Sequence, residues 1–95
     1  MSKRYKELEK VTRRHWNEFD PIGVVDLAEV DDEYYSYLPQ TIKLIMIGAD
    51  EHAFYEHIEQ SVYVNMGLSG IRKYVMRDFA QKLAAIAAQE VGAAQ

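Results

Sequence analysis

The side chains that could do chemistry in this sequence are carboxylates followed directly by tyrosines. Eight of them lie between residues 26 and 37: Asp26, Glu29, Asp31, Asp32, Glu33, Tyr34, Tyr35 and Tyr37. A pair of carboxylates can act as general acid and base, but nothing in this spacing singles out a pair. Carboxylates also attract basic protein surfaces, and a tyrosine ring buries contact area while its hydroxyl keeps a hydrogen-bond partner. The pattern therefore favours a protein-binding surface.

The same tyrosines have a purely structural alternative. Tyr34, Tyr37 and Leu38 could face the core with Tyr35 covering its edge, because tyrosine is often only partly buried. The acidic run could be a solvated surface that maintains solubility. Trp16 and Phe19 are expected in the core, since they complete the apolar face of the first predicted helix.

Neither the histidines nor the serines predict a catalytic or metal centre. Two histidines on one helix bind a metal from positions three or four apart, and His52 and His57 are five apart. His52 and Glu56 have the right spacing, but one such pair is common on helix surfaces. The serines lie in no nucleophile-elbow context, and residues 67–70 lack the lysine of a phosphate loop. We expect no enzymatic activity, no metal and no cofactor.

Charge is distributed unevenly along the chain. The net charge is +4 over residues 1–14, −10 over residues 15–69 and +2 over residues 70–95. An acidic stretch of this density repels phosphates, so direct nucleic-acid binding is disfavoured. The same charge attracts a basic partner and speeds its encounter with the protein.

The amino-acid composition predicts the cellular compartment of the protein. The chain contains no cysteine, which fits a reducing environment. Its first ten residues are charged throughout, and no run approaches the roughly 18 apolar residues that span a bilayer. We expect a cytoplasmic protein that is neither secreted nor inserted into a membrane.

The elements that position these residues are predicted to be helices. Apolar residues at intervals of three to five predict a helix over residues 2–19, which should end at Asp20 because Pro21 disfavours helix in the residue before it. An ordered loop follows, and the carboxylates of residues 31–33 suit the N-terminus of the next helix. Pro39 either kinks that helix or lies in the first turn of a second segment through Ile47.

The second half predicts two more helices. Gly48 is a candidate C-cap and Asp50 a candidate N-cap, with one residue between them. An apolar stripe with a spacing of four predicts a helix closed by Gly67; it consists of Phe54, Ile58, Val62 and Met66. Ser69 is expected to cap a last helix that carries Ile71. The sum is an all-α fold: one compact bundle of about four helices over residues 1–95, with an ordered loop after the first.

Motifs between about residues 8 and 83 resemble a small bacterial family of unknown function that shows Trp-Asp-Pro-Ile-Gly-Val, Asp-Glu-Tyr-Asp-x-Tyr and Met-Gly-Leu. The matching positions are Trp16 with residues 20–24, residues 32–34 with Tyr37, and residues 66–68. Here three residues separate Trp16 from Asp20, and Tyr35 or Ser36 stands where the family often has Asp. The resemblance implies a compact helical fold and no established enzyme activity.

Proteins similar to that family are encoded beside toxins in bacterial competition systems, including contact-dependent inhibition, and act there as immunity proteins. Together with the acidic centre and the adjoining tyrosines, the resemblance predicts an immunity protein or antitoxin that occludes the cleft of a basic toxin domain such as a nuclease. One alternative is a self-associating structural or adaptor module, in which a homodimer forms through apolar and tyrosine surfaces. An enzyme acting on a small molecule ranks third.

Overall fold

The computed structural model of this chain describes residues 3–19 and 34–94. Over these ranges the chain forms α1 (Lys3–Phe19), a short 3-10 helix η1 (Tyr35–Tyr37), α2 (Leu38–Met46), α3 (Glu51–Glu59), a π-helical segment η2 (Gln60–Asn65) and α4 (Lys73–Ala94). The described residues contain no strand, and the predicted all-α bundle of four helices is confirmed. The predicted loop and the predicted helix start at residues 31–33 lie outside the described residues.

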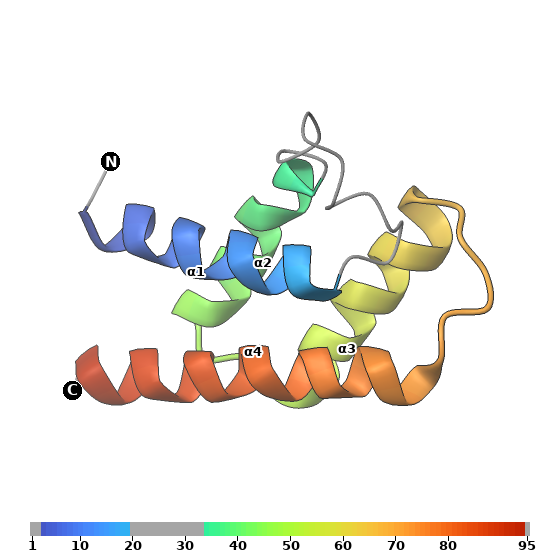
Figure 1. Cartoon of the computed structure of the whole chain (residues 1–95). Helices are drawn as coiled ribbons and strands as arrows, with labels where there is room; N and C mark the ends of the chain where they lie inside the picture. The colour runs from blue at the N-terminus through green and yellow to red at the C-terminus, as the bar shows by residue number, and fades with distance from the viewer. Residues whose placement is uncertain (1–2, 20–33, 95) are drawn as a thin grey trace.

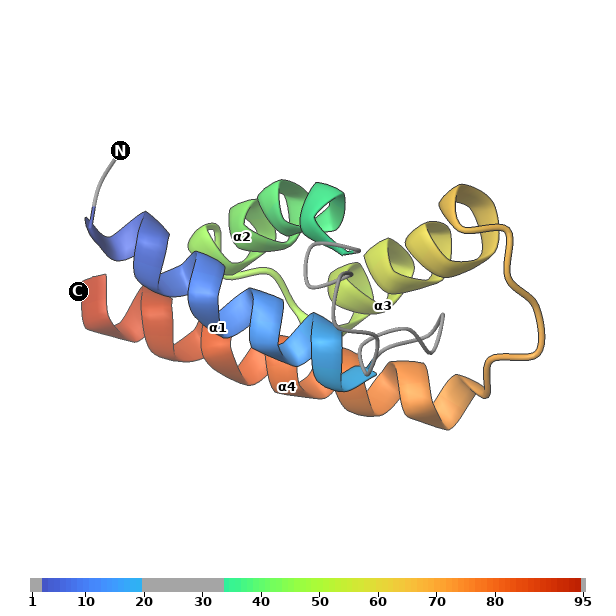
Figure 2. The same cartoon turned by 45° about the horizontal axis from the view of Figure 1, so that its top comes forward.

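The helices form two layers. Figure 1 shows α1 and α4 running antiparallel in front, with α2 and α3 behind them. α3 and α2 both pack on α4, and α1 packs mainly on α2. Figure 2 shows the first turn of α1 beside the last turns of α4. Arg4 hydrogen-bonds Glu90 there and joins the two ends of the chain.

α1 has one buried face and one charged face, as its sequence predicts. Leu8, Thr12 and Trp16 are buried at a spacing of four. Its opposite side carries the residues that we call the basic α1 stripe, all of them exposed: Lys3, Lys6, Lys10 and Arg14. The amphipathic pattern alone therefore fixes which side of α1 meets the core.

Pro39 lies in the first turn of α2, so the second of the two alternatives for this proline is correct. Its missing N–H is harmless there, because the first N–H groups of a helix have no intrahelical partner. The preceding residues form η1, in which the Tyr37 N–H donates to the Tyr34 carbonyl at 3.0 Å. The tyrosine run is thus a separate turn that leads into α2.

The connection between α2 and α3 has the predicted caps. Gly48 has a φ of +70° in the left-handed region, and its N–H donates to the Ile45 carbonyl at 3.1 Å. The Ala49 N–H donates to the Leu44 carbonyl at 3.0 Å, which completes a Schellman motif. The Asp50 side chain accepts from the Ala53 N–H at 2.9 Å, which confirms Asp50 as the N-cap of α3.

The start of the next helix differs from the prediction, whereas the end of this one agrees with it, since Gly67 follows the C-cap Met66 and has a φ of +68°. η2 continues α3 through Asn65, with the Met66 N–H bonded to the Ser61 carbonyl at 2.9 Å. α4 begins at Lys73, so the prediction that Ser69 caps the last helix is wrong. Gly70 has a φ of +81°, which a right-handed helix excludes. The Tyr63 hydroxyl donates to the Ile71 carbonyl at 2.8 Å and holds this connection against η2.

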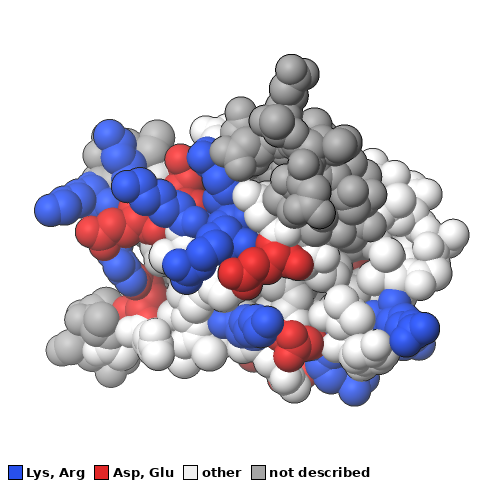
Figure 3. Space-filling view, viewed as in Figure 1, with Lys and Arg blue, Asp and Glu red and all other residues white. Residues whose placement is uncertain are grey.

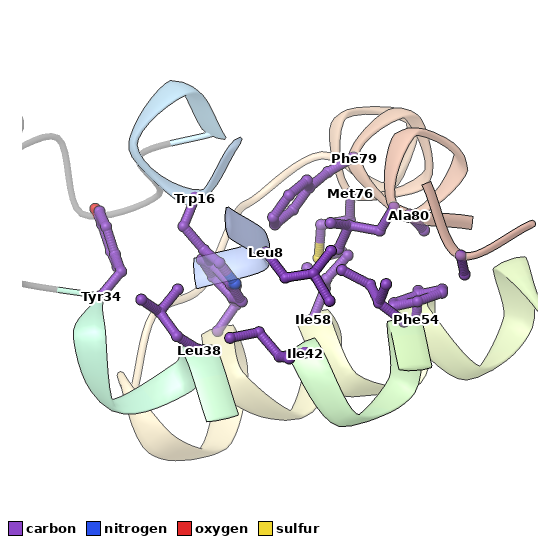
Figure 4. Close-up of a cluster of buried hydrophobic side chains, with 14 residues drawn as sticks. Leu8, Trp16, Tyr34, Leu38, Ile42, Phe54, Ile58, Met76, Phe79 and Ala80 are labelled. Carbon is purple, nitrogen blue, oxygen red and sulfur yellow. The ribbon is translucent and has the colours of Figure 1, made fainter. Parts of the chain in front are cut away.

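The core lies between the two layers and draws on every α-helix (Figure 4). Its largest fully buried side chains include Trp16, Tyr34 and Phe54. Trp16 is therefore in the core as predicted, and Phe19 is partly buried against it. No helix of the described residues is both long and apolar enough to cross a bilayer.

Candidate protein-binding site

Two tyrosines of the predicted site, Tyr34 and Tyr37, gather around Trp16. Its ring stacks with Tyr34 at a centroid distance of 5.8 Å and with Tyr37 at 5.4 Å. The Phe79 ring meets it edge-on at 5.0 Å. Figure 4 shows Trp16 among the core side chains, between Tyr34 and Leu8. Aromatic pairs at these distances contribute beyond the area that they bury.

A hydrogen-bond network lies beneath this aromatic cluster. The Trp16 Nε1–H donates to Thr41 Oγ1 at 3.1 Å, and Thr41 Oγ1 donates to the Tyr37 carbonyl at 2.7 Å. The Nε2 atom of His57 lies 2.7 Å from the same hydroxyl oxygen. A hydroxyl donates one proton, so the bond to Tyr37 leaves His57 Nε2–H as the donor to Thr41. Burial lowers the pKa of His57, which keeps this imidazole neutral at pH 7.

The structure separates the three predicted tyrosines by their exposure. Tyr34 is only 2% exposed and belongs to the core, and Tyr37 is partly buried. Tyr35 is 48% exposed, with the Arg13 guanidinium 5.5 Å from its ring centroid. Tyr35 is therefore the tyrosine of the three that a partner could reach without disturbing the core. The five predicted carboxylates lie outside the described residues: Asp26, Glu29, Asp31, Asp32 and Glu33.

The outward side of α3 and η2 brings together carboxylates and tyrosines that the sequence analysis did not select. We call this surface the acidic α3 face and define it by seven residues: Glu51, His52, Tyr55, Glu56, Glu59, Tyr63 and Val64. Glu51 and Glu56 are exposed, whereas Tyr55 and Tyr63 are partly buried. His52 Nε2 lies 2.9 Å from Glu56 Oε1, and Val64 is 64% exposed. Carboxylates and partly buried tyrosine rings therefore alternate along α3 and η2.

Two shallow hollows lie along this face. Glu56, Glu59, Gln60, Tyr63 and Val64 line the hollow beside η2. Asp50, Glu51, His52, Tyr55 and Arg77 line the one at the start of α3. The bond from Tyr63 to Ile71 fixes the ring beside the first hollow. A fixed tyrosine beside exposed carboxylates is the arrangement of an interface anchor with a charged surround.

A signal for this face exists in the sequence. Glu51, Tyr55, Glu59 and Tyr63 recur at a spacing of four, immediately next to the apolar stripe. That register places them at the border between core and solvent. The acidic run before Tyr34 is denser, so this second, regular pattern is less conspicuous in the sequence.

Positive charge gathers on a different helix, α1. Figure 3 shows lysine and arginine side chains clustered over α1 on the face toward the viewer. The basic α1 stripe lies there, and among the described residues no ion pair involves its four members. α1 packs on α2, whereas α3 packs most extensively on α4. The two charged faces are thus carried by helices that lie in different layers of the bundle.

The histidines form no metal centre with their neighbours. Within residues 3–19 and 34–94, no group of three or more His, Asp or Glu side chains is placed to hold a metal ion. His52 is exposed and His57 packs against Trp16, with ring centroids 6.1 Å apart. The five-residue spacing therefore places the two rings in different environments, as predicted.

A small cavity of about 120 Å³ lies between α1 and α4. Phe19, Val75 and Phe79 form its apolar part, and His15, Glu18, Asp78 and Lys82 its polar part. The Nδ1 atom of His15 is buried and has no hydrogen-bond partner in the described part of the chain, since Glu18 Oε2 lies 3.9 Å away. Burial lowers the pKa of His15, so its ring is neutral at pH 7. Lys82 pairs with Asp78 at 3.2 Å, which leaves the Glu18 carboxylate as the net charge around this cavity.

Comparisons with protein families, with curated proteins and with solved structures find no match to this chain.

Proposed function

We propose that this protein is a non-catalytic inhibitor that binds a basic toxin domain and occludes its active cleft. The acidic α3 face carries the proposal, because its carboxylates surround tyrosine rings fixed by the fold. The motif resemblance supports a bacterial immunity protein and so makes a toxin the first partner to test. The excess of acidic residues in the whole sequence supports a basic partner.

Charge and buried contact area would contribute to binding in different ways. Glu51, Glu56 and Glu59 steer a basic surface toward α3, because complementary potentials raise the rate of encounter. Tyr55 and Tyr63 then supply contact area, and their partial burial reduces the entropy lost when a partner covers them. A toxin cleft built for phosphate matches this face, since it presents the lysines and arginines that the carboxylates attract.

The candidate site residues selected from the sequence, between residues 26 and 37, contribute less to the proposed binding. Tyr35 is exposed and could extend the contact, whereas Tyr34 and Tyr37 support it from the core. The carboxylates from Asp26 to Glu33 add attraction through their charge alone.

Growth of bacteria that express the product of the neighbouring gene tests the proposal. We expect that product to arrest growth and co-expression of this chain to restore it. Reversing two charges by Glu56→Lys and Glu59→Lys should abolish the rescue, because the variant repels the basic cleft. A single charge reversal, Glu18→Lys, at an exposed residue of α1 is the control and should leave the rescue intact.

Two outcomes would contradict the proposal. Full rescue by the double α3 variant would remove this face from the mechanism. Rescue that fails with the wild-type chain, although both proteins accumulate and this chain is folded, would reject the neighbouring product as the partner.

A further inference from the structure

The basic α1 stripe has no part in the proposed function. Lys3, Lys6, Lys10 and Arg14 follow one line of the helix on the side opposite Leu8 and Trp16. They span about 16 Å at a rise of 1.5 Å per residue. Within residues 3–19 and 34–94 this row has no ion-pair partner. A row of like charges on a helix repels itself, and an anionic surface that covered it would relieve this repulsion.

An anionic surface of comparable length exists on the same molecule. The carboxylates of the acidic α3 face, from Glu51 to Glu59, span about 12 Å along a helix. Among the described residues, no ion pair involves Glu51 or Glu59. Because α1 and α3 share no extensive contact, the two faces cannot neutralise each other within one chain.

We infer that the basic α1 stripe docks onto the acidic α3 face of a second copy of this chain. Such a contact is heterologous, because different surfaces of the two copies meet, and it leaves one face of each type free. Further copies can then add in the same way, to form either a closed ring or an open chain. The association is weak and sensitive to salt, since exposed ion pairs each contribute little.

A second copy fits the basic stripe better than a polyanion does. The chain carries a net charge of −4, and the acidic stretch repels phosphates at long range. Another copy presents Glu51, Glu56 and Glu59 on its α3, so that cationic side chains of one helix can pair with anionic side chains of another. The inference also predicts regulation of the proposed function, because the α1 stripe of one copy competes with a toxin for the α3 face of another.

Sedimentation velocity of the purified chain at low and high salt tests this inference. At about 10 mM salt the Debye length is near 30 Å, and at about 1 M it is near 3 Å. We expect concentration-dependent oligomers at low salt and monomers at high salt. Lys6→Glu with Lys10→Glu, and Glu56→Lys with Glu59→Lys, should each weaken self-association roughly tenfold or more.

A fourfold exchange distinguishes specific pairing from an effect of net charge. The chain with all four substitutions keeps the net charge of the wild type and exchanges two charges between the two faces, so that two carboxylates lie on α1 and two lysines on α3. We expect it to associate again, and we expect an equimolar mixture of the two double variants to form mixed oligomers. The variant Asp31→Asn with Asp32→Asn and Glu33→Gln is a control for the other acidic run and should self-associate like the wild type.

Three results would overturn the inference: monomers of the wild type at low salt, failure of the fourfold exchange to restore association, or loss of association only in the residue 31–33 variant. The Lys6 and Lys10 variant also separates this inference from the proposed function. It should lose self-association and keep the rescue of growth, because its acidic α3 face is unchanged.

Discussion

Trp16 and Thr41 are joined by a hydrogen bond in the core, from the indole Nε1–H of α1 to the hydroxyl oxygen of α2 at 3.1 Å. The same hydroxyl contacts the Tyr37 carbonyl and the His57 imidazole. One side chain thus links α1, η1, α2 and α3. Buried polar groups in such a network are costly to leave unpaired.

Thr41→Val should destabilise the protein by at least about 2 kcal/mol, because it leaves the buried Trp16 Nε1–H without its acceptor. Thr41→Ser keeps the hydroxyl and loses one methyl group, so it should cost about 1 kcal/mol or less. Urea unfolding monitored by the fluorescence of Trp16, the only tryptophan, measures both values. Equal losses in the two variants would show that the hydroxyl contributes nothing beyond packing.

Stability should fall as the pH drops below about 6.5. Burial lowers the pKa of His57 in the folded state, so the unfolded chain binds protons that the folded chain does not. The stabilising effect of a neutral His57 is complete above the unfolded pKa of about 6.5 and declines as the pH falls toward the folded pKa. The free energy of unfolding at about pH 7.5 and at about pH 5 measures this decline.

His57→Gln should flatten that pH dependence. The pKa of His15 is also lowered by burial, so part of the decline should persist in this variant. A His57→Gln variant that keeps the entire wild-type difference between the two pH values would refute the assignment.

Gly48→Ala should cost more than the same change at Gly70. Both glycines have a φ in the left-handed region, where a side chain costs about 1 kcal/mol or more. At Gly48 the new Cβ would also collide with the Val91 side chain of α4, whereas the position at Gly70 is open. Thermal unfolding of the two variants gives the difference in stability. Equal melting temperatures would mean that α4 moves away from the new methyl group without a loss of stability.

Tyr34 and Tyr35 should respond oppositely to substitution by alanine. Tyr34→Ala removes a buried ring stacked on Trp16 and should destabilise the protein by about 3 to 5 kcal/mol. Tyr35→Ala should change stability by about 0.5 kcal/mol or less, because the ring is half exposed. Circular dichroism during urea unfolding compares them, and similar losses would contradict the different roles assigned to these neighbours.

Local patterns in the sequence predicted most of the helical framework. The apolar spacing in α1 identified the side that buries Leu8 and Trp16, and Gly48 and Asp50 marked a real connection because their caps depend on nearby residues alone. Ser69 failed as a cap because Gly70 and the bond from Tyr63 to Ile71 extend the connection to residue 72. That bond joins residues of two elements, which helical periodicity does not report.

The candidate site was harder to predict than the framework. Tyr34, Tyr35 and Tyr37 share a residue type and neighbourhood, but only the position of Trp16 decides which rings are buried. η2 likewise looks like an ordinary continuation of α3, because its apolar stripe keeps a spacing of four. The Ser61 hydroxyl bonds the His57 carbonyl there, and such bonds disturb helices in ways that depend on packing.

The central claim is that the carboxylates of the acidic α3 face attract a basic partner. Its most direct test is the association rate constant between this chain and the purified product of the neighbouring gene, measured by stopped flow across a range of salt concentrations. We predict that Glu56→Lys with Glu59→Lys slows association at least tenfold at low salt and flattens its salt dependence, whereas Glu18→Lys changes neither. An α3 variant with the same rate and the same salt dependence as the wild type would contradict the claim.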